Sequence, residues 1–175
     1  MQFDAWAYDL RPGMPPEGIA REQASAGRTY PPGYIDNLRA TARAAGIEMK
    51  RPLLIPSTSK AHEATEFAKE QGKLHAFHRA VFHAYFEREE NIGDIDILRR
   101  IGGECGMDAD ALRQALDDGR YAAAVEEQMQ WSRDAGITGV PTTIFNERFA
   151  LVGAQDYDVF RDVARRVLER DKPTA

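Results

Sequence analysis

The single cysteine of this 175-residue chain lacks the surroundings that make a thiol reactive. Cys105 lies in the stretch Gly-Gly-Glu-Cys-Gly-Met-Asp, so the nearest charges in sequence are those of Glu104 and Asp108. A catalytic thiol needs a helix N-terminus or a nearby cation to lower its pKa, and carboxylates act in the opposite sense. One cysteine also cannot form an internal disulfide, a Cys-x-x-Cys pair or a cysteine-rich zinc site. We therefore interpret Cys105 as a structural thiol.

The four histidines do not form a recognisable metal or acid–base motif. His75, His78 and His83 lack the i, i+4 spacing of a zinc-binding His-Glu-x-x-His helix, and no acidic residue stands between them as a base. His62 lies apart from these three. Acidic pairs such as Asp117-Asp118 fall on polar faces or at ends of expected helices, where solvation explains them. We expect no metal site, and the residues alone provide no nucleophile.

Pro141 is the residue with the most informative position. It precedes a short β-branched run in Gly-Val-Pro-Thr-Thr-Ile-Phe, although proline cannot donate to a sheet ladder. A cis Val140–Pro141 bond would turn the chain and leave the backbone of Val140 facing outward, where an extended thiol-bearing peptide could pair with it. The alternative is a trans proline that opens an edge strand.

Composition excludes several classes of function. The net charge of −5 argues against a nucleic-acid surface. No window approaches the roughly 18 apolar residues of a membrane-spanning helix, and the first ten residues lack the features of a signal peptide. With one cysteine, these features favour a soluble protein in the reducing cytoplasm.

The elements that must position Pro141 follow from hydrophobic periodicity. Residues 2–10 alternate as in a strand, residues 14–33 are typical of a long loop, and residues 142–145 and 148–152 resemble a hairpin with its turn at Asn146-Glu147. Asp94 and Asp108 are expected to cap helices, the hydroxyls of Ser57 and Thr58 to cap another, and glycines to end several of them. The predicted helices span 33–46, 57–72, 73–87, 93–106, 107–119, 121–136 and 153–170.

The stretch Gly-Ile-Thr-Gly-Val-Pro-Thr, followed by the hairpin and Gly-Ala-Gln, resembles the DsbA-like thioredoxin superfamily, in particular its FrnE-type branch near the 2-hydroxychromene-2-carboxylate isomerases. Upstream, Ser57, Thr58, Ala61 and His62 resemble the start of a helix in that family, with Ser57 in place of the usual Asn. The resemblance extends over nearly the whole chain. It implies an α/β, thioredoxin-like (DsbA-like) fold in one domain, residues 1–175. The thioredoxin-like part would be 1–33 and 137–175, and 34–136 would be a large helical insertion.

The resemblance also implies a site and an omission. Pro141 would be the cis-proline, and Val140, Pro141 and Thr142 would bind the thiol substrate. Family members begin with a strand and a helix carrying Cys-x-x-Cys, or a serine in the isomerase branch. That unit of roughly 30 residues is absent before the strand matched by residues 2–10. We expect either that Met1 is an internal methionine of a longer reading frame, or that another chain, such as a second copy, completes the sheet.

Three functions follow from the resemblance. The first is a DsbA-family thiol–disulfide oxidoreductase domain, N-terminally truncated and redox-inactive as written, with a protein or glutathione as thiol or disulfide substrate. The second is a glutathione-dependent isomerase or transferase, in which the tripeptide lies on Val140 and its γ-glutamyl end lies near Gln155 and Asp156. Asp156 as a plain helix cap is the alternative there. The third is a non-catalytic thioredoxin-like binding module. No cofactor other than glutathione is expected.

Overall fold

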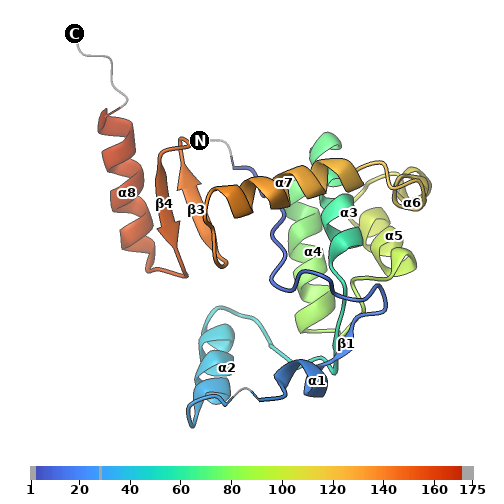
Figure 1. Ribbon diagram of the computed structural model, residues 1–175, viewed down its shortest axis with the longest axis horizontal. Coiled ribbons are helices and arrows are strands. Elements are labelled where there is room, and N and C mark those ends of the chain that lie inside the picture. The colour runs from blue at the N-terminus through green and yellow to red at the C-terminus, as the bar shows by residue number, and fades with distance from the viewer. Residues whose placement is uncertain (1–2, 28, 171–175) are drawn as a thin grey trace.

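The main hydrophobic core is formed by four helices in the middle of the chain, in a computed structural model that describes residues 3–27 and 29–170. These helices are α3 (Ser59–Glu70), α4 (Leu74–Phe86), α5 (Ile95–Glu104) and α6 (Ala109–Asp117). Their largest fully buried side chains are Phe77, Leu98, Ile101, Leu112 and Leu116. Helix α7 (Ala122–Asp134) packs across α3 and leads away from this core (Figure 1). The helical periodicity of the sequence is confirmed for all five helices.

Local signals at the helix ends are largely confirmed. The side chain of Asp94 accepts hydrogen bonds from the backbone N–H groups of Asp96 and Ile97, and that of Asp108 caps α6 in the same way. Gly136, just beyond α7, has a φ of 69°, the left-handed conformation that glycine adopts at little cost. The expected hydroxyl cap of α3 is wrong. Thr58 makes no side-chain capping bond, and the hydroxyl of Ser57 lies 3.4 Å from that of Ser59 instead.

The N-terminal segment is not the strand expected over residues 2–10. Residues 3–9 form no strand, and Gln2 lies outside the described residues. A strand needs a hydrogen-bonded neighbour, and this segment lies against α7 instead. The N–H of Ala7 donates to the side chain of Gln128 (2.8 Å), and the ring of Trp6 meets that of Trp131 edge to face at 4.9 Å.

Two short elements lie within the range expected to be a loop, residues 14–33. Strand β1 (Ile19–Ala20) pairs antiparallel with β2 (Leu54–Ile55), and helix α1 (Arg21–Ser25) follows directly. Gly18 permits this pairing, because a Cβ atom there would lie 2.5 Å from the carbonyl oxygen of Ile55. Strand β2 also interrupts the range expected to be helical. Elements of two to five residues are too short to produce a periodic pattern.

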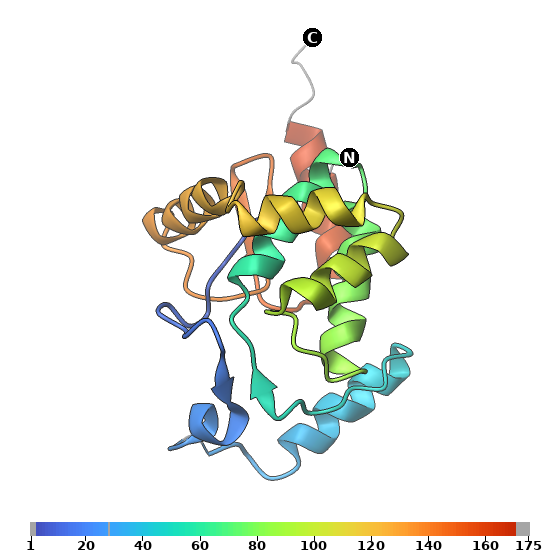
Figure 2. The same cartoon turned by 90° about the vertical axis from the view of Figure 1, so that its right-hand side faces the viewer.

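Helix α2 (Tyr34–Ala44) confirms the first predicted helix but contributes no buried residue. It lies with α1 at one end of the molecule, away from α5 and α6 (Figures 1 and 2). Among the described helices, none combines the length and the apolar character needed to cross a membrane.

The C-terminal unit confirms the predicted hairpin and final helix. Strands β3 (Thr142–Phe145) and β4 (Phe149–Val152) pair antiparallel, and Asn146 and Glu147 both have positive φ, as in a type I′ turn. Helix α8 (Tyr157–Arg170) follows, with the C-terminal unit lying on the opposite side of α7 from α5 and α6 (Figure 1). Several large apolar side chains of this unit are exposed: Ile144, Val152, Tyr157, Val159 and Leu168.

Candidate functional site

The loop between α7 and β3 is held in place by hydrogen bonds on both sides of Val140. The Val140–Pro141 peptide bond is cis. The carbonyl oxygen of Pro141 accepts a hydrogen bond from the N–H of Gly153 (2.8 Å), which ties the loop to the end of β4. The hydroxyl of Thr142 donates to the carbonyl oxygen of Gly139 (2.8 Å). The sequence-predicted residues Val140, Pro141 and Thr142 therefore share one fixed turn.

Val140 itself presents unused backbone groups at this turn. Within residues 3–27 and 29–170, neither its N–H nor its carbonyl oxygen has a hydrogen-bond partner, and its side chain is 49% exposed. Val140 directly precedes Pro141, and β3 begins at the following residue, Thr142. A free donor and acceptor at the start of a strand can pair with an extended peptide, which adds to the sheet as a further strand.

A cavity of about 390 Å³ lies between the N-terminal segment, the start of α3 and one side of α4. We call it the His62 cavity. Its walls are mainly apolar, and they include Ile55, Val81, Phe82 and Met129. Its polar residues come from three separate parts of the chain, the N-terminal segment, the start of α3 and one side of α4: Tyr8, Asp9, Arg11, Ser57, Thr58, Ser59, His62, Thr65, His78 and Tyr85. An apolar pocket with a few converging polar groups is the usual form of a small-molecule site.

Two imidazoles in this cavity are poor bases. Burial lowers the pKa of His62, an effect that Asp9 opposes and His78 reinforces. Burial also lowers the pKa of His78, helped by the positive charge of Lys69 and by His75. Both rings are therefore neutral at pH 7. A neutral imidazole can donate one hydrogen bond and accept another, which suits a polar but uncharged part of a ligand.

Tyr8 connects the cavity with the loop. Its side chain lines the His62 cavity, and its hydroxyl donates to the carbonyl oxygen of Ile137, at 3.3 Å. Ile137 begins the loop that carries Val140. Tyr8 thus links a wall of the cavity to a residue three positions before Val140.

The residues suggested for glutathione occupy the turn before α8. The side-chain amide of Gln155 donates to the carbonyl oxygen of Val152 (3.0 Å), so one of its two N–H donors is used within its own turn. Asp156 immediately precedes α8, and its carbonyl oxygen accepts from the N–H of Val159 (3.0 Å). Both side chains are exposed.

Cys105 lies apart from the loop and from the cavity. It ends α5 and packs partly against the helical core. Burial raises the pKa of its thiol, and Glu104 adds to this effect while Lys73 opposes it. Among the described residues, no cluster of three or more histidine, cysteine, aspartate or glutamate side chains could hold a metal ion.

Residue types and spacing did not predict that His62 and His78 line the same cavity. The two lie on different helices, and a distance of sixteen positions in sequence carries no information about proximity. The one sequence signal was the resemblance that singled out Ala61-His62.

Comparisons with known proteins place this arrangement among its relatives. Residues 1–164 match the model of the DSBA-like thioredoxin domain. The chain is 35% identical over 127 residues to the uncharacterized protein YwbO of Bacillus subtilis (strain 168). That match covers 71% of this chain and 63% of YwbO, so the chain spans less than two thirds of this curated relative.

Solved structures share the same backbone arrangement. A probable DsbA oxidoreductase from Streptomyces coelicolor superposes with a TM-score of 0.80 at 27% identity, covering 96% of this chain and 76% of that one. A 2-hydroxychromene-2-carboxylate isomerase has a TM-score of 0.67 at 16% identity, covering 95% of this chain and 81% of that one. At 16% identity, the second similarity concerns the fold alone.

Proposed function

This chain belongs to the family of DSBA-like thioredoxin domains, and on that premise we propose that it is a domain of the thiol–disulfide oxidoreductase type. The α/β, DsbA-like thioredoxin fold expected from the sequence is confirmed. In the proposed role, the chain binds a thiol- or disulfide-bearing substrate along Val140, Pro141 and Thr142. We place this activity in the cytoplasm.

The free backbone of Val140 is the observation that carries the proposal. The loop is fixed on both sides, yet the N–H and carbonyl of Val140 have no partner among the described residues. An extended substrate could form two main-chain hydrogen bonds there, and the His62 cavity, which Tyr8 links to this loop, could receive one of its side chains. The neutral imidazoles of His62 and His78 would then contact a polar group of that side chain, and Asp9 and Arg11 are the charged residues of the same lining.

The sulfur chemistry needs groups that this sequence does not contain. In thiol–disulfide exchange, a thiolate attacks one sulfur of a disulfide, a mixed disulfide forms, and the other sulfur leaves as a thiolate. A dithiol enzyme needs two cysteines, and these 175 residues have only Cys105. We therefore propose that the 175-residue chain binds substrate but does not catalyse dithiol exchange. Measurable turnover in an insulin-reduction assay with the purified chain would contradict this part.

The binding part can be tested with two substitutions at one position. Val140→Pro removes the N–H of residue 140, whereas Val140→Ala keeps it and shortens only the side chain. A ten-residue extended peptide containing one S-methylated cysteine is titrated into each variant by calorimetry. We expect Val140→Ala to bind within about threefold of the wild type and Val140→Pro to lose at least tenfold. Equal affinities for the two variants would overturn the proposal, provided that circular dichroism shows both to be folded.

Glutathione is the second candidate ligand, favoured by the exposed turn before α8. The N-terminus of a helix attracts carboxylates, and α8 begins directly after Gln155 and Asp156. The tripeptide would lie on the backbone of Val140 with its γ-glutamyl end at this turn, as in an isomerase or transferase. Calorimetry with glutathione tests this alternative. Saturable binding that Val140→Pro weakens would support it, and absence of binding at millimolar concentration would exclude it.

A second copy of the chain is the partner we propose for the exposed C-terminal unit. The hairpin has only two strands, and Ile144, Val152 and Leu168 are exposed on it and on α8. Isolated hairpins are marginally stable in water, and large exposed apolar patches mark interfaces. A folded monomer in light scattering at micromolar concentration would count against this partner.

The third function is a non-catalytic binding module. A partner protein that binds the chain equally well under oxidising and reducing conditions would favour it.

A further inference from the structure

A second cavity, of about 180 Å³, lies between α2 and the segment that leads into β2. We call it the Arg39 cavity. Four positively charged residues line it, and none of the described residues in its lining is acidic: Arg21, Arg39, Lys50 and Arg51. The whole chain has a net charge of −5, so this surface has the opposite sign to the average. The lining includes no residue of the Val140–Pro141 loop.

Arg21 supplies a fixed charge at the base of the cavity. Its Nε donates to the carbonyl oxygen of Pro52, and its Nη2 donates to the hydroxyl of Tyr85 at 2.8 Å. The backbone N–H of Arg21 also donates to the carbonyl oxygen of Leu53, at 2.7 Å. All of these acceptors are neutral, so they hold the guanidinium in place without cancelling its charge.

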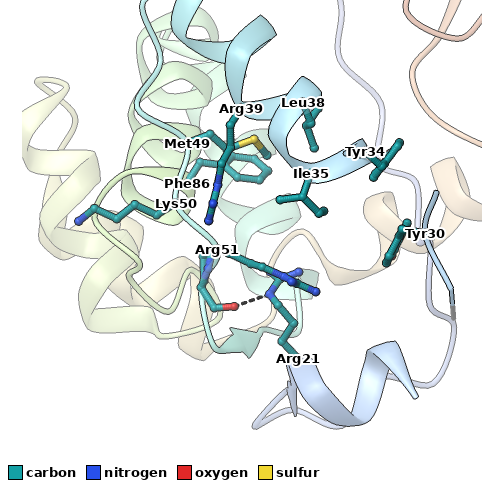
Figure 3. Close-up of a pocket in the computed structure, with 11 residues that line it drawn as sticks. Arg21, Tyr30, Tyr34, Ile35, Leu38, Arg39, Met49, Lys50, Arg51 and Phe86 are labelled. Carbon is teal, nitrogen blue, oxygen red and sulfur yellow. Dashed lines mark hydrogen bonds between the residues drawn. The ribbon is translucent and has the colours of Figure 1, made fainter. Parts of the chain in front are cut away.

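Arg39 and Arg51 carry charges that are not neutralised. Neither side chain has an ion pair or a hydrogen bond within residues 3–27 and 29–170. Figure 3 shows Arg39 extending from α2 toward Arg51 and Arg21, while Lys50 points away from them. The ammonium group of Lys50 lies 3.9 Å from a carboxylate oxygen of Glu89. These guanidinium groups line one cavity without a carboxylate among its lining residues, so an anion bound there would be attracted by all three charges.

The other side of the cavity is flat and apolar. The rings of Tyr30 and Tyr34 stack with centroids 5.2 Å apart and planes 10° apart, and they lie opposite Arg51 in Figure 3. The two tyrosines are 43% and 45% exposed. In Figure 3, Ile35 and Leu38 lie between the tyrosines and Arg39, and Met49 and Phe86 lie beside Arg39. Such surfaces bind the face of an aromatic ring.

We propose that the Arg39 cavity binds a small phosphate monoester that carries an aromatic ring. A phosphate monoester brings nearly two negative charges and three acceptor oxygens, which matches Arg39 and Arg51 as forked donors and Arg21 as a fixed charge. Its ring would lie along Tyr30 and Tyr34. The volume is below the roughly 300 Å³ of a typical pocket for drug-sized ligands, so the cavity accepts a phosphate with one ring.

Calorimetric titration with three probes tests separately whether the charged groups and the aromatic wall contribute to binding. The probes are phenyl phosphate, inorganic phosphate and phenol, each added to the full chain at low ionic strength. We expect phenyl phosphate to bind at least tenfold more tightly than either of the others, because only it uses both the guanidinium groups and the aromatic wall. Equal affinity for phenyl phosphate and inorganic phosphate would overturn the proposal, as would the absence of saturable binding.

Two variants of α2 separate a built site from a general surface field. Arg39→Gln removes a guanidinium that lines the cavity, whereas Arg43→Gln removes one from the same helix that pairs with Glu48 outside it. We expect Arg39→Gln and Arg51→Gln each to weaken phenyl phosphate binding about tenfold, and Arg43→Gln to change it less than twofold. Similar losses from Arg39→Gln and Arg43→Gln would show a non-specific electrostatic effect and contradict the assignment. Circular dichroism of each variant verifies the fold.

Discussion

The hydroxyl of Tyr8 lies 3.3 Å from the carbonyl oxygen of Ile137, which joins two parts of the chain 129 positions apart. Tyr8 belongs to the segment that walls the His62 cavity, and Ile137 begins the loop that carries Val140. The proposed binding surface is therefore assembled by tertiary contacts. Ala7 adds to the same connection, because its N–H donates to the side chain of Gln128 on α7 (2.8 Å).

Removing the hydroxyl of Tyr8 should lower the stability of the contact between the N-terminal segment and the loop that carries Val140. Tyr8→Phe keeps the ring and deletes the hydrogen bond, which at this length and partial exposure contributes at most about 0.5–1 kcal/mol. We expect a fall of that size in the free energy of unfolding, measured with urea, and two- to fivefold weaker binding of the S-methylated peptide. A variant with unchanged stability and unchanged affinity would show that Tyr8 does not position the loop.

The two buried imidazoles predict how stability depends on pH. Burial lowers the pKa of His62 and of His78 in the folded state, while the unfolded value is about 6.5. Above that value both rings are neutral in both states and the stability is complete. As pH falls below it, the unfolded chain takes up protons first, so the free energy of unfolding decreases until the folded-state pKa is passed. Urea denaturation between pH 7.5 and 5.5 should show this decrease, and the double variant His62→Gln, His78→Gln should show a flatter profile. Parallel profiles would contradict the assignment.

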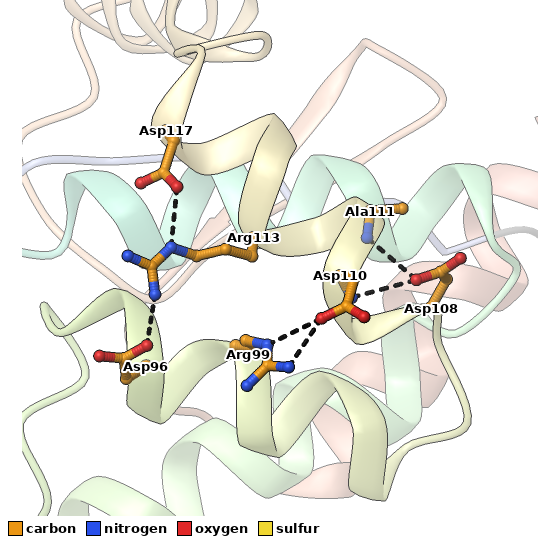
Figure 4. Close-up of polar contacts among 7 residues, drawn as sticks. All are labelled: Asp96, Arg99, Asp108, Asp110, Ala111, Arg113 and Asp117. Carbon is orange, nitrogen blue, oxygen red and sulfur yellow. Dashed lines mark hydrogen bonds and ion pairs between the residues drawn. The ribbon is translucent and has the colours of Figure 1, made fainter.

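The N-terminal cap of α6 should contribute more to the free energy of unfolding than its surface ion pair. Asp108 accepts from the N–H groups of Asp110 (3.0 Å) and Ala111 (2.9 Å), whereas Asp117 only pairs with the exposed side chain of Arg113 (Figure 4). Asp108→Ala leaves helix donors unpaired and should cost about 1 kcal/mol in the free energy of unfolding. Asp117→Ala should change it much less, because exposed ion pairs are screened by water and salt. Equal losses in urea denaturation would contradict this ranking.

The thiol of Cys105 should react slowly. Burial raises its pKa above the ordinary value, so the thiolate fraction at pH 7 is smaller in the folded chain than in the unfolded chain. Alkylation by iodoacetamide should therefore be slower in buffer than in urea at pH 7, and its rate should reach half of its maximum at a higher pH in the folded chain than in the unfolded chain. A folded chain that reacts faster than the unfolded one would identify Cys105 as an activated thiol.

The parts of the fold that sequence could predict are those with local causes. Hydrophobic periodicity predicted the helices over 73–87 and 93–106, and the apolar side chains of Phe77, Leu98 and Ile101 on them are fully buried. Asp94 and Asp108 cap helices as predicted, because a cap depends on residues two or three positions away. The hairpin turn at Asn146-Glu147 is likewise a local signal.

The parts that failed depend on distant partners. The alternation of side chains in the N-terminal segment predicted a strand there. Residues 3–9 instead pack on α7 and form no strand. Strands β1 and β2 have two residues each, and they form because Ile19 pairs with Ile55 in an antiparallel register. The same applies to the candidate site: Val140 and Pro141 were found from a motif, whereas the cavity joining Tyr8, His62 and His78 arises only from packing.

Amide hydrogen exchange at Val140 distinguishes a substrate bound along this backbone from one bound elsewhere. In the free chain its N–H has no partner among the described residues, while the N–H of Gly153 bonds to the carbonyl oxygen of Pro141 (2.8 Å) and serves as the internal control. On saturation with the S-methylated peptide, we expect exchange at Val140 to slow at least tenfold while exchange at Gly153 changes little. Binding of the peptide with unchanged exchange at Val140 would show that the substrate lies elsewhere and that Val140 is not its binding site.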